Sequence, residues 1–236
     1  MITTEVRLES TGSTMDAARA LAAGQDFLLV SAREQTRGKG TRGRAWNPGP
    51  GNIYMTVGVH RRHLPPPRMA LFPLELGLHV RDECSARIEA EIRSRLALKW
   101  PNDLLWLGRK AGGILVESHG DHLLAGIGLN LAHAPEVADG GAPSASLAEA
   151  GVPAEAHDAI VEGIYRRLRE APGDLRFDGE TLLLRWQARM DWNRSYRLRD
   201  RHGNPEVMPV SVNAQGHLLV RHPDGREEWL VSDYLS

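Results

Sequence analysis

The 236-residue sequence contains a single cysteine, Cys84, so an intramolecular disulfide and a cysteine metal cluster are both excluded. It has no apolar run long enough to cross a membrane, and its first residues lack the apolar core of a signal peptide. We therefore expect a protein of the reducing cytoplasm that does not bind membranes. Cys84 lies in a helix-like apolar run, where a buried thiol is expected rather than a nucleophile.

The sequence also lacks an excess of either charge, since it has 29 basic and 30 acidic residues and a net charge of −1. Binding to nucleic acid through bulk charge requires a strong basic excess, which argues against that function. Lysine itself is scarce, because only Lys39, Lys99 and Lys110 are lysines. All three lie in two unusual segments, residues 35–46 and 99–113. A compact ammonium group is not interchangeable with the planar fork of arginine, so these segments are the candidate chemical sites.

Hydrophobic patterning predicts an α+β body, a mixed sheet with helices. Strands are predicted at 6–8, 27–32, 53–59, 104–107, 114–117 and 123–130. Helices are predicted at 15–23, 69–96, 156–170 and 179–190, with residues 65–67 as a proline linker and 108–113 as a hairpin loop. Ser13 or Thr14 is expected to cap the first helix. Short strand candidates at 194–200, 206–212, 217–221 and 227–231 predict a small terminal β-barrel.

Residues 35–46 form a glycine-rich basic segment with almost nothing to bury. Residues 38–43 match G-x-G-x-x-G, but the dinucleotide fingerprint requires a helix directly afterwards, and Asn47-Pro48 prevents one. A Walker loop is excluded as well, because Gly40 follows Lys39 where serine or threonine is needed. The segment is either a solvated basic loop or a mobile loop whose backbone N–H groups bind an anion.

The second segment begins with Lys99-Trp100-Pro101-Asn102-Asp103 and continues to Lys110 and Gly113. It is either a plain strand–turn–strand corner or a place where a carboxylate and an ammonium group meet at one mouth of the sheet. The histidines show no H-E-x-x-H spacing and no supporting acids, so no metal site is assigned. A serine hydrolase is excluded because no G-x-S-x-G motif exists.

Assembled in order, these motifs resemble the biotin protein ligase family. The resemblance is carried by Ser13-Thr14, Gln35 with the 38–46 loop, residues 99–103, residues 109–117, Gly126-Ile127-Gly128-Leu129-Asn130 and residues 144–147. It implies a catalytic domain at 1–188, of the fold that biotin and lipoate ligases share, and an SH3-like β-barrel at 189–236. It implies no DNA binding, because the catalytic pattern starts at the first residues, and it leaves a homodimer open.

The resemblance also implies a reaction: biotin and Mg·ATP give biotinyl-5′-AMP, which then modifies a lysine of a biotin carboxyl carrier protein, a subunit of acetyl-CoA carboxylase. Lys110 and Asp103 would be catalytic, with Asp103 either orienting Lys110 or holding Mg²⁺. The biotin and adenylate contacts implied are Ser13, Thr14, Gln35, Gly38, Lys39, Gly40, Thr41, Lys110 and Gly113. The ATP contacts implied are Arg42, Arg44, Trp46, Asn102 and Asn130.

Three positions depart from the family pattern. Lys39 and Thr41 stand where the family usually has arginine, and Met15 stands where it prefers asparagine. The contact of that asparagine is therefore not carried over. Two other functions stay in competition: a lipoate-type ligase of the same superfamily, and a non-catalytic module that binds biotin or a nucleotide.

Overall fold

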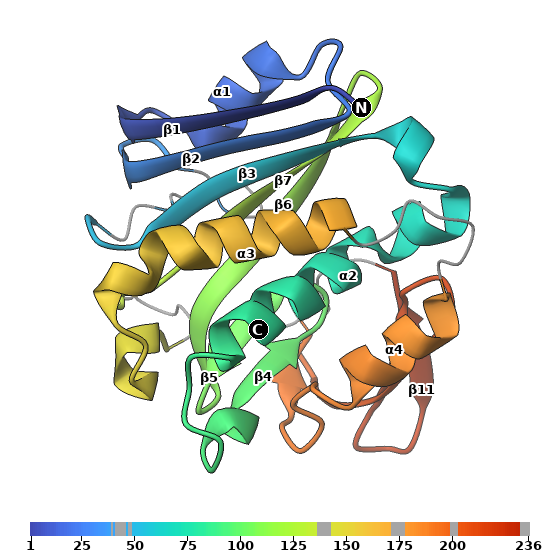
Figure 1. The fold of residues 1–236 in the computed structure, drawn as a ribbon. Coiled ribbons are helices and arrows are strands. Elements are labelled where there is room, and N and C mark those ends of the chain that lie inside the picture. The colour runs from blue at the N-terminus through green and yellow to red at the C-terminus, as the bar shows by residue number, and fades with distance from the viewer. Residues whose placement is uncertain are drawn as a thin grey trace.

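The computed structural model describes residues 1–38, 40, 46, 49–135, 143–170, 178–198 and 203–231. These residues form a seven-stranded sheet in the order β1-β2-β3-β7-β6-β5-β4 (Figure 1). Its strands are β1 (Thr3–Thr11), β2 (Phe27–Gln35), β3 (Ile53–His60), β4 (Leu96–Lys99), β5 (Asp103–Trp106), β6 (Arg109–His119) and β7 (His122–Leu129). The β1–β2 pair is parallel and every other pair is antiparallel, which confirms the mixed sheet.

Side chains of β2 show how the sheet is covered on both faces. Phe27 and Leu29 belong to the large core, whereas Leu28 and Val30 belong to a smaller cluster under α1 (Thr14–Leu21). Alternate residues of a strand point to opposite faces, so α1 lies on one face of the sheet. The helices α2 (Pro66–Ser85) and α3 (His157–Glu170) pack on the other (Figure 1).

Several predicted boundaries were wrong. The prolines at 65–67 do not form a linker, since Pro66 and Pro67 open α2, where a missing N–H costs nothing. The predicted helix 69–96 ends at Ser85 and gives way to a short 3₁₀ turn, η3 (Arg93–Arg95), and then β4. The predicted loop 108–113 lies mostly within β6. Its turn is Leu107-Gly108, where both residues have positive φ as a tight hairpin requires.

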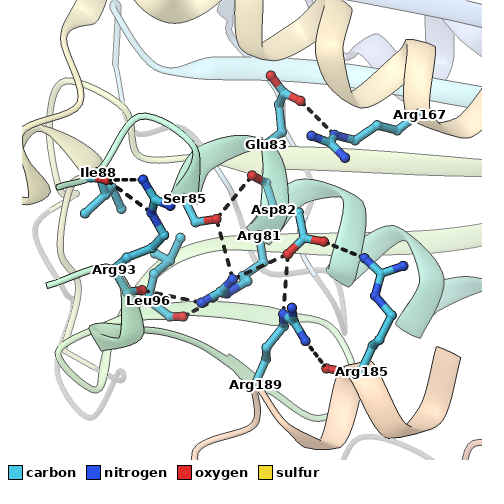
Figure 2. Close-up of polar contacts among 10 residues, drawn as sticks. All are labelled: Arg81, Asp82, Glu83, Ser85, Ile88, Arg93, Leu96, Arg167, Arg185 and Arg189. Atoms are coloured by element: carbon cyan, nitrogen blue, oxygen red, sulfur yellow. Dashed lines mark hydrogen bonds and ion pairs between the residues drawn. The ribbon is translucent and has the colours of Figure 1, made fainter. Parts of the chain in front are cut away.

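Charged side chains tie the helical layer together (Figure 2). Asp82 on α2 forms ion pairs with Arg185 on α4 (Gly179–Gln187) at 2.8 Å and with Arg189, just after the end of α4, at 3.4 Å. The neighbouring Glu83 pairs with Arg167 of α3 at 2.8 Å. Adjacent carboxylates on α2 therefore bind different helices. Cys84, next along the chain, is completely buried, and burial raises the pKa of its thiol to about 12, so the expectation of a structural cysteine is confirmed.

After α4 the described chain forms a second, antiparallel sheet in the order β11-β10-β9-β8. Its strands are β8 (Tyr196–Arg197), β9 (Glu206–Val212), β10 (Leu218–Arg221) and β11 (Glu227–Leu230). This sheet agrees with the expected SH3-like unit. It is fastened to the body, since Leu98 of β4 donates to the carbonyl of Arg189 at 2.8 Å and the Trp100 indole donates to the carbonyl of Gly216 at 2.8 Å. The domain boundary at 188/189 stays a prediction.

Asp26 fastens the start of the chain. Its buried carboxylate accepts a hydrogen bond from the backbone N–H of Ile2 at 2.7 Å and contacts Arg62 and His63. The His63 contact is the main cause that lowers the pKa of Asp26, followed by the Ile2 N–H and Arg62. A carboxyl group whose pKa is lower in the folded protein stabilises the fold above its unfolded pKa of about 3.9. That stabilisation is lost as the pH falls below this value.

We therefore expect Asp26→Asn to lower the free energy of unfolding at pH 7, and the gap from wild type to shrink steadily below about pH 4. Urea titrations of both proteins from pH 7 to pH 2.5 measure this gap. A gap that is constant over the whole range would show that ionisation of Asp26 does not stabilise the fold.

Candidate functional site

A pocket of about 70 Å³ opens on the α1 face of the sheet. Its walls come from α1, from the strands β2, β3, β5, β6 and β7, and from Gly40 and Trp46 of the basic segment. Predicted site residues that line it are Ser13, Thr14, Gln35, Gly40, Trp46, Asn102, Asp103, Lys110 and Gly113. The two segments singled out by their lysines therefore meet in one cavity.

One end of the pocket is a chain of polar groups. Gln35 Oε1 accepts from the backbone N–H of Thr14 at 2.8 Å and from its hydroxyl at 3.2 Å. The hydroxyl of Thr56, in the middle of β3, lies 2.9 Å from that of Thr14. Ser13 is the N-cap of α1 and accepts from the N–H of Asp16, so the expected cap is confirmed. Thr14 remains directed at Gln35. This end presents hydroxyl and amide groups that are already oriented.

The middle of the pocket is apolar. Met15 of α1 and Leu115 of β6 line it, and Met15 belongs to the buried cluster under α1. Gly126 on β7 makes this packing close, because a Cβ there would lie 3.2 Å from the terminal carbon of Met15. Met15, which stands where the family prefers asparagine, is therefore buried and forms an apolar wall of the pocket.

The other end of the pocket is charged. Lys110 Nζ lies 2.5 Å from Asp103 Oδ1, and Lys99 Nζ lies 3.9 Å from Asp103 Oδ2. Gly113 leaves room here, since a Cβ at this position would lie 3.2 Å from Lys110 Nζ. The structure therefore brings Asp103, Lys110 and Gly113 together as the sequence predicted. Of the two roles left open for Asp103, orientation of Lys110 matches this contact.

The backbone of Lys110 is held on both sides. Its N–H donates to the carbonyl of Pro143 at 2.8 Å, and its carbonyl accepts from the N–H of Ala145 at 2.9 Å. The amide of Asn130 donates to the carbonyls of both Lys110 and Ala145, at 3.1 and 3.0 Å. Lys110 therefore projects from a rigid edge, and the predicted glycine-flanked loop does not carry it. Asn130 does not line the pocket, and its contact with ATP stays a prediction.

Residues predicted on the nucleotide side contain two unsatisfied polar atoms. Asn130 Oδ1 and Trp46 Nε1 are buried, and neither has a hydrogen-bond partner among the described residues. The Trp46 indole lies over Gly128, and Lys110 Nζ is 5.9 Å from its ring centroid. Asn102 lines the pocket and donates to the carbonyl of Ile114 at 2.7 Å. Of Asn130 and Trp46, only Trp46 lines the pocket, where a polar ligand could accept its hydrogen bond.

Four predicted site residues, Lys39, Thr41, Arg42 and Arg44, lie outside the described residues. Gly38 is described, and it permits a close approach of the chain, because a Cβ there would lie 1.9 Å from the carbonyl oxygen of Trp46. The roles of these residues stay predictions.

Sequence reasoning missed Thr56 and the ion pair between Arg19 and Glu117, all at or beside the pocket. A lone hydroxyl residue inside the apolar run 53–59 was the available signal for Thr56. No sequence signal joins Arg19 to Glu117, since 98 positions separate them. Within the described ranges, no group of three or more histidine, cysteine or acidic side chains is placed to hold a metal ion.

We expect Gly128→Ala to displace the Trp46 indole, because the new Cβ would lie 2.2 Å from Trp46 Nε1. The tryptophan emission should shift to the red as this ring becomes solvated, and the shift should vanish in a Trp46→Phe background. Gly126→Ala on the same strand is the control, since its Cβ would meet Met15 instead of Trp46. Equal emission from wild type and Gly128→Ala would contradict the packing.

Comparison with known proteins identifies the fold and the family. Residues 7–132 match the family model of the biotin/lipoate A/B protein ligase family. A biotin–[acetyl-CoA-carboxylase] ligase of Mycobacterium tuberculosis is 35% identical over 67% of this chain. The matched region makes up 59% of the length of that protein. A protein of the same name from Paracoccus denitrificans is 32% identical over 93% of this chain and 95% of the Paracoccus protein.

A solved structure agrees over nearly the whole chain. The biotin protein ligase of Leishmania major in complex with biotin is 33% identical, with a TM-score of 0.75, over 97% of this chain and 98% of its own. The same protein has been solved in complex with biotinyl-5-AMP. The match includes the terminal sheet, and it confirms the α+β fold class. The chain belongs to the biotin/lipoate A/B protein ligase family.

Proposed function

We propose that this protein is a biotin protein ligase, which activates biotin with ATP and transfers it to a lysine of a biotin carboxyl carrier protein. The observation that carries the proposal is one pocket with an oriented polar end at Thr14 and Gln35 and a cationic end at Lys110. The relatives named above support the substrates, since two are called biotin–[acetyl-CoA-carboxylase] ligases and a third binds biotin and biotinyl-5-AMP.

The two ends of the pocket match the two ends of biotin. The ureido ring is a compact donor and acceptor group, and Thr14 and Gln35 offer a hydroxyl and an amide group at one end, with Thr56 hydrogen-bonded to Thr14 behind them. The valeryl chain is hydrocarbon and fits the apolar middle beside Met15 and Leu115. The carboxylate then reaches the charged end. A polar ring, an apolar chain and an anion are bound in that order along the pocket.

At the charged end, a carboxylate oxygen of biotin attacks the α-phosphorus of ATP. The new bond is carboxylate oxygen to phosphorus, and the bond from that phosphorus to pyrophosphate breaks. Two anions must approach each other in this step, so fixed positive charge stabilises the transition state more than the separated reactants. The ammonium group of Lys110 has that role, and Asp103 orients it.

The nucleotide is assigned to the side of Trp46, Asn102 and Asn130. The Trp46 N–H has no partner among the described residues and can donate to a purine ring, whereas Asn130 lies behind the pocket wall and is included only because the family resemblance implies it. Lys39, Thr41, Arg42 and Arg44 belong to the basic segment between Gly38 and Trp46, and we assign that segment to the phosphates and the adenylate.

In the second step the amine of an acceptor lysine attacks the carbonyl carbon of biotinyl-5′-AMP. An amide bond forms, the bond from that carbon to the phosphate oxygen breaks, and AMP leaves. The names of the relatives point to the carrier subunit of acetyl-CoA carboxylase as the acceptor.

Magnesium enters with ATP rather than as a resident ion. The described residues hold no cluster of metal ligands, and Asp103, the carboxylate nearest to the reaction, already faces two ammonium groups. Mg²⁺ usually keeps several waters and binds through substrate phosphates with one or two carboxylates. We therefore treat Mg·ATP as the substrate and assign no protein ligand.

A lipoate ligase is the nearest competing function, because the family model covers both activities. The described pocket favours biotin, since its polar end carries the hydroxyl of Thr14 and the amide of Gln35, which can hydrogen-bond a ureido ring but not the apolar dithiolane ring of lipoate. A non-catalytic binding module is disfavoured, because Lys110 and Asp103 are held in contact.

Exchange of labelled pyrophosphate into ATP tests the function. We expect exchange with biotin present, none without it, and none above background with lipoate. Exchange that depends on lipoate would establish the competing ligase. The absence of exchange with either acid would leave only the non-catalytic module.

Lys110→Met should lower biotin-dependent exchange by about 100-fold or more, as expected when a donor aimed at developing charge is removed. The methionine keeps the length of the aliphatic side chain, and Lys110 is not in the hydrophobic core, so the free energy of unfolding should change little. Exchange and urea denaturation are measured on the same preparations. Normal exchange by this variant would contradict the role of Lys110.

A further inference from the structure

Asp103 faces a second lysine, Lys99, which does not line the pocket. Lys99 and Asp103 stand directly opposite each other in the β4–β5 hairpin, so their side chains leave the same face of the sheet. Lys99 Nζ lies 3.9 Å from Oδ2 of the carboxylate, while Lys110 Nζ lies 2.5 Å from Oδ1. Each oxygen of Asp103 therefore faces a different ammonium group.

Lys99 is placed behind the site rather than in it. It is 7% exposed and does not line the catalytic pocket, whereas Lys110 and Asp103 do. Its ammonium group also lies 5.2 Å from the ring centroid of Tyr196, on β8 of the terminal sheet. A buried ammonium group is costly unless it is paired, and the carboxylate and the ring face offset that cost.

The charges of the three side chains give Lys99 a consequence for chemistry. Lys99, Asp103 and Lys110 together carry a net charge of +1, while Asp103 and Lys110 alone are formally neutral. A neutral pair offers little attraction to the biotin carboxylate and the phosphates of ATP. We propose that Lys99 is a positioning residue for the adenylation step, which holds Asp103 from behind and leaves the positive charge of Lys110 available to the substrates. This inference rests on the proposed function.

The sharing of Asp103 also affects how easily Lys110 turns toward the substrates. A carboxylate shared by two ammonium groups holds each less tightly than it would hold one alone, because the two positive charges repel each other. Lys110 therefore gives up less stabilisation when its ammonium group moves from Asp103 to the reacting anions. Asp103 meanwhile keeps Lys99 as a partner and is not left uncompensated.

The space around Lys99 suits lysine and not arginine. A cavity of about 10 Å³ lies beside it, lined also by Leu98 and Trp186, and this is too small for the extra atoms of a guanidinium group. Arginine supplies 26 of the 29 basic residues, so lysine at position 99 is an exception in this chain. The confined space gives a physical reason for it.

The test is Lys99→Met, which keeps the chain length and removes the charge. We expect the kcat of biotin-dependent pyrophosphate exchange to fall by roughly 10- to 100-fold, the range typical of residues that support a site from behind. The KM for biotin should change far less than kcat, because Gln35 and Thr14 still bind the far end of the molecule, whereas the charge acts mainly on the negative charge that builds up in the transition state. Lys99→Gln, measured in parallel, keeps a polar group and serves if the methionine variant does not fold.

A matched control separates positioning from stability. Arg68→Met breaks a buried ion pair with Glu75 at 2.8 Å, in α2 and outside the pocket. It should lower the free energy of unfolding and leave kcat unchanged at a temperature where the protein is folded. A loss of kcat in this control equal to that in Lys99→Met would show that the lysine acts only through stability, and would overturn the inference.

A double-mutant cycle tests the route of the effect. If Lys99 acts through Asp103, Lys99→Met should add little to the loss in an Asp103→Asn background. Independent losses that multiply would overturn the inference, as would normal kcat in Lys99→Met. Those outcomes leave the proposed function intact, whereas wild-type protein without biotin-dependent exchange overturns both.

Discussion

The pocket exists because the central strand β7 carries no side chain at two successive positions that face α1. Gly126 pairs with Thr56 and Leu115, and Gly128 pairs with Tyr54 and Gly113, across the two neighbouring strands. Alternate residues face one side of a sheet, so the missing side chains fall in one line. Elsewhere, Ala18 of α1 and Leu28 of β2 fill the layer between the helix and the sheet. The register of β3, β7 and β6 thus decides where a ligand fits.

The same register decides which groups meet at the ends of that line. Strand β3 brings Thr56 to the polar end, while β5 and β6 bring Asp103 and Lys110 to the charged end. A shift of one strand by a single residue would turn its side chains to the opposite face and separate the residues of the site. On the other face, the ion pairs of Asp82 and Glu83 join α2 to α4 and to α3 (Figure 2).

Much of the sheet and the main site residues were predictable from sequence. The strands 27–32, 53–59 and 123–130 had clear apolar runs; the first two lie within β2 and β3, and the third matches β7 except for its last residue. The glycines at 112 and 113 misled the assignment of β6, because they serve close packing: a Cβ on Gly112 would lie 2.5 Å from the Leu129 side chain. Contacts between distant positions, such as Arg19 with Glu117 or Tyr196 with Lys99, leave no local pattern in the sequence, so they could not be predicted from it.

The position of Trp46 has a thermodynamic consequence. Its indole lies on Gly128, beside the space that we assign to the nucleotide. Any ligand group that takes the place of the ring must first displace it, so the measured affinity for that ligand equals the intrinsic affinity reduced by the fraction of protein in which the ring has moved.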